Sequence, residues 1–395
     1  MQHSPEGSSQ NVLYLGLVSF FTDLASAMIN PVVPLFLVIV LQEGVDKVGL
    51  ILAITSMISY GLRFVCGALS DRFDSSKPLL ITGYGLSALT KPLLAFVGGW
   101  QGVALVRSAE RLGKALRAAP KDRLIGLSGK KGSEGKSFGL HKTFDVAGEF
   151  CGLFVLLIVL FALGTSESVF RGVFLAALIP GILAVLILAV FVRDRSSPLK
   201  KKPSVRFHLD RELRKPVIVY CGMSLFMFSE AFYVVLANER DFKMTSILMV
   251  LILMRAVQLL LSYRVGKLVD KYDSTLLLNT GYGFGLLALI ALLDSSAYTL
   301  VLAFLLFGIS DVVLLNAIRA KISKDAREKG AAFGAFYLLH AICLAAGLAL
   351  LGYVWEAYGI QAVLIFSISG MGLCFLIQLV VPAGKASRPD VELQE

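Results

Sequence analysis

A short stretch of the sequence places four cationic side chains close together in apolar surroundings. They are Arg107, Arg111, Lys114 and Arg117, and Glu110 lies among them. At about 100° per residue, all five fall on one face of a helix, and leucines and alanines occupy the opposite face. Arginine presents a fixed fork of donors that matches a carboxylate or a phosphate group. The spacing therefore predicts a helix with a cationic face that is suited to binding an anion.

The part of this face around Arg107 and Arg111 is the candidate binding site, because it lies farthest from the charged end of the predicted helix. A charge at membrane depth costs from about 2.5 kcal/mol upward, so it faces protein or a water-filled cavity and finds a partner. We expect Arg107 and Arg111, with Glu110 between them, to bind an anionic or zwitterionic solute. An internal ion pair with Glu110 or Asp145 is the alternative. The other cations lie nearer the predicted helix end, where they could reach lipid headgroups or loop carboxylates.

Four acidic residues stand in apolar segments and could exchange protons: Asp23, Asp145, Glu230 and Asp311. A carboxyl group that is shielded from water holds its proton more tightly and can exchange it when its access changes. We expect proton coupling through Asp23, Glu230 or both, with the other two as weaker candidates. The alternatives are a fixed salt bridge to Arg107, Arg111 or Lys91 and, for Asp145, contact with His141 one helical turn away.

The composition indicates which elements position these side chains. Of the 395 residues, 56% are hydrophobic and 17% are charged. Soluble proteins carry about 25% charged residues, and about 20 mostly apolar residues cross a bilayer as a helix. The sequence therefore predicts an all-α membrane protein with twelve transmembrane helices. They are expected at 12–41, 47–69, 78–98, 100–120, 137–163, 170–192, 216–238, 244–266, 275–293, 297–320, 331–354 and 358–382.

The net charge of +10 is concentrated in alternate loops. Such an asymmetry is typical of cytoplasmic loops and predicts that both termini lie in the cytoplasm. Because no aromatic and basic platform accompanies the charge, we do not expect nucleic acid binding. The polar N-terminus has no cationic region before a short apolar core, so we expect no cleavable signal peptide.

The two halves of the chain contain matching sequence motifs in the same order. "GALSDRFDS" at 67–75 returns as "GKLVDKYDS" at 266–274, and "TGYG" follows each copy. "FTD", which contains Asp23, returns as "FSE", which contains Glu230. The sequence therefore predicts two six-helix bundles, 1–192 and 216–395, joined by a basic cytoplasmic linker at 193–215. Parallel halves of this kind enclose a midplane site in secondary transporters.

These motifs resemble the major facilitator superfamily over almost the whole chain. "GALSDRFDSSK" is similar to that superfamily's loop motif between the second and third helices. "TDLASAMINPVVP", "TKP" and "ERLGKALRAAPKDRLI" look like one bacterial and archaeal branch of it. The resemblance implies alternating access and a clamp on the cytoplasmic side. Its residues would be Gly67, Asp71 and Arg72, with the repeat partners Gly266, Asp270 and Lys271.

Two prolines interrupt the first apolar segment. Proline frees a backbone carbonyl and kinks a helix, and transporters tolerate this where a neighbour or a cavity restores the polar contact. Pro31 and Pro34 could therefore form a flexing gate on the outer half of the protein. A static kink is the alternative.

We expect no enzyme, cofactor or metal. "GSEGKS" at 132–137 lacks the earlier glycine of a phosphate-binding loop, and the cysteines and histidines have no ligand spacing. The prediction is a monomeric, proton-coupled transporter of a small organic solute in the bacterial cytoplasmic membrane, in contact with lipids. A multidrug exporter is the first alternative, although Leu153 follows Gly152 where an antiporter motif has proline. A non-transporting receptor or scaffold is the second alternative, and the short linker and tail speak against it.

Overall fold

The computed structural model describes residues 6–62, 75–128, 134–194, 209–326 and 328–380, and every regular element in these ranges is a helix. The N-terminal elements are α1 (Glu6–Ile29), α2 (Val32–Leu35), η1 (Phe36–Val40), α3 (Val45–Ser56), η2 (Met57–Gly61), α5 (Lys77–Thr90), η3 (Lys91–Phe96), α6 (Trp100–Ser128), α7 (Glu134–Leu163), α8 (Glu167–Ala176) and α9 (Leu178–Val190). The C-terminal elements are α10 (Arg211–Ser224), α11 (Glu230–Glu239), α12 (Met244–Lys271), α13 (Ser274–Ala291), α14 (Ala297–Asp325) and α15 (Lys329–Val380). The predicted all-α fold is confirmed.

Eight helical stretches in these ranges are long and apolar enough to cross a membrane. One of them, within α15, contains the non-helical residue Gly359, whose φ of 83° and ψ of 173° bend the helix into two arms. Glycine is favoured at this turn because a Cβ makes a positive φ costly. The count of twelve spans and the internal repeat stay predictions.

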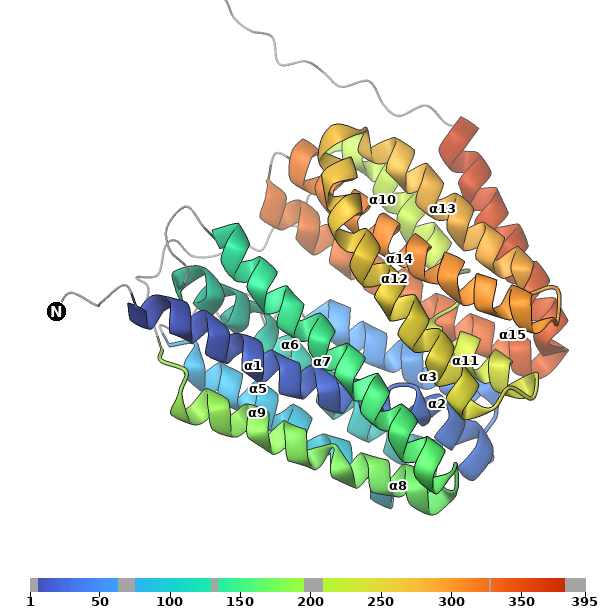
Figure 1. Cartoon of the computed structure of the whole chain (residues 1–395). Coiled ribbons are helices and arrows are strands. Elements are labelled where there is room, and N and C mark those ends of the chain that lie inside the picture. The colour runs from blue at the N-terminus through green and yellow to red at the C-terminus, as the bar shows by residue number, and fades with distance from the viewer. Residues whose placement is uncertain (1–5, 63–74, 129–133, 195–208, 327, 381–395) are drawn as a thin grey trace, which may run out of the picture.

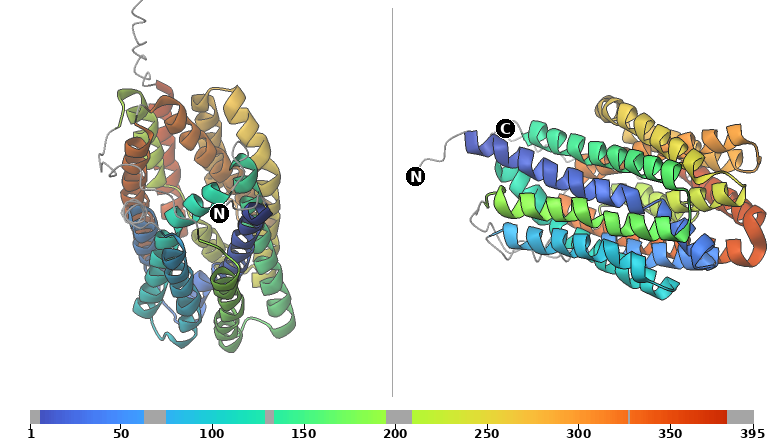
Figure 2. Two further views of the ribbon diagram at one scale, coloured as in Figure 1. Left: turned by 90° about the vertical axis from the view of Figure 1, so that its left-hand side faces the viewer. Right: turned by 60° about the horizontal axis from the view of Figure 1, so that its bottom comes forward.

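The helices gather in two groups. Figure 1 shows α1–α9 in its lower part and α10–α15 in its upper part, and Figure 2 shows that most of the long helices run roughly parallel. The predicted domain bounds stay predictions, because most of the linker at 193–215 lies outside the described residues.

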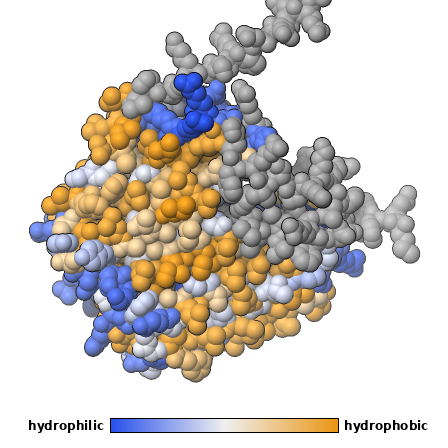
Figure 3. Space-filling view, turned by 180° about the vertical axis from the view of Figure 1, so that it is seen from behind, coloured by the Kyte–Doolittle hydropathy of each residue, from blue (hydrophilic) through white to orange (hydrophobic). Residues whose placement is uncertain are grey.

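Apolar side chains cover much of the outer surface. Figure 3 shows one face on which hydrophobic residues dominate, with hydrophilic residues gathered in patches near its edges. Phe161 on α7 is 81% exposed and Phe96 at the end of η3 is 75% exposed. Large apolar side chains in such numbers suit contact with lipid and not with water.

Close packing against α5 fixes the charged helix α6. A Cβ added to Gly83 on α5 would lie 2.8 Å from the carbonyl oxygen of Gly113 on α6, and one added to Gly113 would lie 2.7 Å from that of Gly83. Small residues allow membrane helices to approach this closely. The side of α6 next to this contact carries the charged residues described below.

The two groups of helices meet tightly at one end. A Cβ added to Gly49 on α3 would lie 2.5 Å from the carbonyl oxygen of Leu348 and 2.9 Å from the Cα atom of Gly352, both on α15. The backbone N–H of Val45 donates a hydrogen bond to Glu356 Oε2 at 2.8 Å. We call this contact the closed end.

Candidate functional site

Three cavities follow one another through the interior. The aromatic cavity has a volume of about 320 Å³, the central cavity about 70 Å³ and the basic cavity about 350 Å³. Glu230 and Arg255 line both the aromatic and the central cavity. Asp23, Lys114 and Glu149 line both the central and the basic cavity. Neighbouring cavities therefore share wall residues, and the three form a series that extends from the second group of helices into the first.

Arg255 on α12 joins carboxylates from both groups of helices. Its Nη2 atom lies 2.6 Å from Glu230 Oε2 on α11, and its Nη1 atom donates to Gln258 Oε1 at 2.8 Å. Its Nε atom lies 3.9 Å from Glu149 Oε2 on α7. Sequence reasoning left Arg255 without a role and expected Glu230 to pair, if at all, with Lys91 or with arginines of α6.

Sequence reasoning also missed Glu149. The available signal was its position: Glu149 follows Asp145 by four residues, so both carboxylates project from one face of the same helix. Both residues line the basic cavity. Asp145 Oδ1 lies 3.3 Å from His141 Nδ1, which is the contact expected between these two residues.

Arg107 and Glu110 form an ion pair inside the protein. Arg107 Nη1 donates to Glu110 Oε2, and Arg107 Nη2 donates to Asn30 Oδ1 at 2.8 Å. Arg107 is 7% exposed and Glu110 is 6% exposed. The internal ion pair that was the alternative to solute binding by Arg107 is therefore present. Glu110 also lines the central cavity.

The neighbouring cations of α6 differ in their surroundings. Arg111 and Lys114 line the central cavity, and neither has a hydrogen bond or ion pair with another described residue. Arg117 is buried, donates to Ser87 Oγ at 2.7 Å and to the carbonyl oxygen of Gly83 at 3.2 Å, and lies 4.3 Å from the ring centre of Tyr84. We expected the cations nearer the end of the helix to reach lipid headgroups or loop carboxylates. This expectation is wrong for Arg117, because α5 supplies its partners.

Asp23 lines the central and basic cavities without a bonded partner in the described part of the chain. Lys91, one of the cations considered as its partner, is 1% exposed and donates to the carbonyl oxygen of Thr22 at 3.3 Å instead. In this conformation Asp23 therefore faces cavity space with Lys114 on the same wall.

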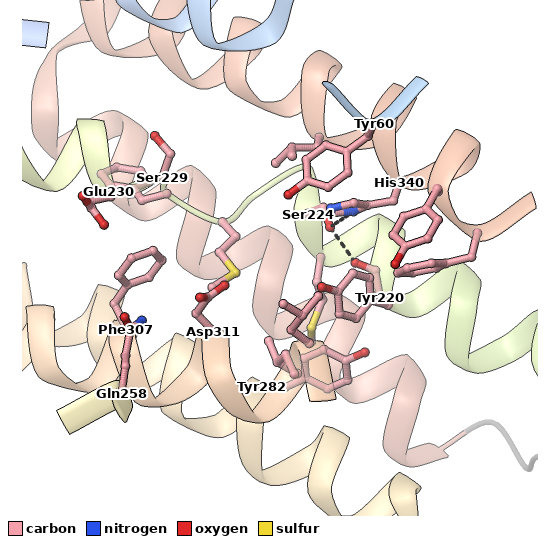
Figure 4. Close-up of a pocket in the computed structure, with 18 of the residues that line it drawn as sticks. Tyr60, Tyr220, Ser224, Ser229, Glu230, Gln258, Tyr282, Phe307, Asp311 and His340 are labelled. Carbon is pink, nitrogen blue, oxygen red and sulfur yellow. Dashed lines mark hydrogen bonds between the residues drawn. The ribbon is translucent and has the colours of Figure 1, made fainter. Parts of the chain in front are cut away.

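The aromatic cavity has one carboxylate without a bonded cation among the described residues, although Arg255 and Arg319 act on it electrostatically. Asp311 on α14 is exposed to the cavity, and no hydrogen bond or ion pair joins it to another described residue. Figure 4 shows Asp311 between Glu230 at one end and the rings of Tyr60, Tyr220 and His340 at the other.

The rings at the far end come from three elements. Tyr60 of η2 lies 5.2 Å from His340 of α15 between ring centres, and Tyr220 of α10 lies 5.4 Å from the same ring. Phe336 stacks on His340 at 5.8 Å, and Tyr337 faces Tyr60 at 6.5 Å. Ser224 Oγ lies 3.1 Å from His340 Nδ1, which holds the imidazole in place.

The structure describes only some of the residues that are predicted to act as gates. Gly67, Asp71 and Arg72 lie outside the described residues. Gly266 and Asp270 belong to the last turns of α12, and of these two residues only the backbone is described. Lys271 ends that helix with its Nζ atom 5.5 Å from the Tyr272 ring centre.

The break in the first apolar segment lies where the prolines predict it. α1 ends at Ile29 and α2 begins at Val32, with Pro31 as its N-cap and Pro34 buried within it. Asn30 and Pro31 line the central cavity. Their role as a gate stays a prediction.

Among the described residues, no group of His, Cys, Asp and Glu side chains is arranged to hold a metal ion. Charged groups, hydroxyls and aromatic rings are among the groups that line the three cavities. Such a set can bind an organic solute and exchange protons with it.

Comparison with known proteins shows the family and the fold of this chain. The family model described as Major Facilitator Superfamily matches residues 15–347. An uncharacterised MFS-type transporter of Methanocaldococcus jannaschii is 31% identical over 360 residues, which cover 88% of this chain and 89% of that protein. The fold is similar to that of the nucleoside transporter NupG, with a TM-score of 0.74 at 14% identity over 93% of this chain and 98% of that one. It is also similar to a POT family transporter solved with 5-aminolevulinic acid, with a TM-score of 0.76 at 12% identity over 93% of this chain and 95% of that one.

Proposed function

Because the chain belongs to the major facilitator superfamily and is therefore a multi-pass membrane transporter, we propose that it moves a small organic solute by alternating access as a secondary active transporter. The observation that carries this proposal is the run of linked cavities whose charged walls come from both groups of helices. A rocking motion of one group against the other would carry such a site from one side of the membrane to the other.

The closed end supports an inward-facing conformation. If both termini are cytoplasmic, as the loop charges predict, the contact of Gly49 with Gly352 lies on the outer side. The basic cavity lies toward the opposite end, where Lys121 and Asp122 of α6 and Lys142 of α7 line it. We place the transporter as a monomer in the bacterial cytoplasmic membrane, surrounded by lipid.

An anionic or zwitterionic solute fits the unpaired cations of α6. Arg111 and Lys114 face the central cavity and are available to a carboxylate or a phosphate. Arg107 and Glu110 would act beside them by positioning the helix and the Asn30 turn. A multidrug exporter is the second candidate, because the aromatic cavity could hold lipophilic compounds; its ligands would bind independently of Arg111.

Coupling to protons is proposed for the carboxylates that face the cavities. Glu230 competes with Glu149 for Arg255, and these two carboxylates come from different groups of helices. Protonation of Glu230 would remove its negative charge and weaken its ion pair with Arg255. The contact between the two groups of helices would then change. Asp23, Asp145 and Asp311 are further candidates for the same task.

We expect Glu230→Gln to exchange solute across the membrane but to lose accumulation driven by a pH gradient, because glutamine cannot carry the proton. The measurement is uptake into proteoliposomes of a solute first found by thermal-shift screening, since a ligand that binds the folded state raises its melting temperature.

The matched control is Glu167→Gln, which removes an exposed carboxylate paired with Arg171 at 2.8 Å on α8. It should respond to the gradient as the wild type does. Full accumulation by Glu230→Gln would count against coupling through this residue and would move the proposal to Asp23.

A further inference from the structure

The aromatic and central cavities carry opposite unpaired charges. In the aromatic cavity, Glu230 is neutralised by Arg255, and Asp311 remains without a bonded cation among the described residues. In the central cavity, Arg111, Lys114 and Asp23 have no bonded partner among the described residues, so one cation is in excess there. A solute that carries one charge would satisfy only one of these cavities and leave the other unpaired.

The aromatic cavity is built to take an ammonium group on an aromatic or apolar body. Its volume of about 320 Å³ lies at the lower end of the range of ligand pockets, which runs from about 300 to 1,000 Å³. Tyrosine rings attract cations to their faces, and a carboxylate nearby adds a charged partner. Tyr60 and Tyr220 contribute such rings, and Phe307 lies between Asp311 and Glu230 (Figure 4).

Asp311 and Arg111 line neighbouring cavities. The aromatic and central cavities share Glu230 and Arg255 as wall residues, so the two cavities lie next to each other.

Resting on the function proposed above, we propose that the solute is a zwitterion whose ammonium group binds at Asp311 among the aromatic rings and whose anionic group binds at Arg111. This assigns the aromatic cavity as an organic-cation subsite. It also explains why a transporter with a cationic helix keeps an unpaired carboxylate in its interior.

Three probes that share one ring test the proposal by calorimetric titration of the purified full-length protein. They are phenylethylamine with an ammonium group, para-ethylbenzoic acid with a carboxylate, and para-(aminoethyl)benzoic acid with both. We expect the zwitterion to bind most tightly. Asp311→Asn should weaken it about tenfold or more and leave the carboxylate probe unchanged. Arg111→Gln should weaken the zwitterion and the carboxylate probe and leave the ammonium probe unchanged.

Two further variants separate recognition from folding. Asp311→Glu keeps a carboxylate and should retain the preference for the ammonium group. Asp294→Asn changes an exposed acid between α13 and α14 and should bind all three probes as the wild type does. Melting temperatures near that of the wild type show that the variants are folded.

The proposal is overturned if the zwitterion binds no more tightly than the single-charge probes, if Asp311→Asn leaves its affinity unchanged, or if none of the probes binds. These results are distinct from a failure of the proposed function. Tight, Asp311-dependent binding without flux in proteoliposomes would keep the subsite and reject transport. Flux of a compound whose binding does not depend on Asp311 would reject the subsite and support transport.

Discussion

Gly49→Leu is expected to abolish net transport and to leave ligand binding in place. Even a Cβ at this position would lie 2.5 Å from the carbonyl oxygen of Leu348, so a leucine would hold α3 and α15 apart. The closed end could then no longer form, and the cavity would stay accessible from that side. The measurement is solute flux in proteoliposomes, with ligand affinity determined on the same preparation.

The matched control is Gly85→Leu on α5, where an added Cβ meets no atom within 4 Å. This variant should transport as the wild type does, since nothing packs against the new side chain. Normal flux in Gly49→Leu would mean that the closed end is not part of the transport cycle.

Glu110→Gln is expected to lower the free energy of unfolding by about 3–5 kcal/mol, because it leaves the guanidinium group of Arg107 buried without its counter-charge. Arg107 is 7% exposed, and its hydrogen bond to Asn30 would remain without supplying a negative charge. The measurement is thermal and denaturant unfolding of the purified protein in detergent.

Two comparisons make this result specific to the buried pair. Glu167→Gln breaks an exposed pair and should cost less than about 1 kcal/mol. The double variant Arg107→Gln/Glu110→Gln should be more stable than Glu110→Gln alone, because no uncompensated charge is left inside. A double variant that is less stable than either single variant would show that the two residues act independently.

The all-α membrane fold was predictable because length and hydropathy dominate it. Apolar stretches long enough to cross a bilayer are visible without any tertiary information, and the break at Pro31 follows from the missing backbone donor. The cationic face of α6 was predictable for the same reason, since helical spacing alone places Arg107 and Glu110 within reach of each other.

The pairing of charges between helices was not predictable in the same way. Arg255 meets Glu230 and Glu149 only because α12 packs beside both α11 and α7, and no spacing in the sequence encodes that arrangement. The rings that line the aromatic cavity come from η2, α10, α13, α14 and α15, among other segments, so no single segment carries its pattern. Arg117 likewise found its partners on α5 and not at the helix end where they were expected.

The most direct test of the account is solute counterflow in proteoliposomes. The vesicles are loaded with the unlabelled compound that raises the melting temperature most, and are diluted into a trace of the same compound carrying a label. A site that opens alternately to the two sides predicts transient accumulation of label above the outside concentration, which is absent in Gly49→Leu. Binding of the compound without any accumulation beyond that of empty liposomes would contradict transport and favour a receptor or scaffold.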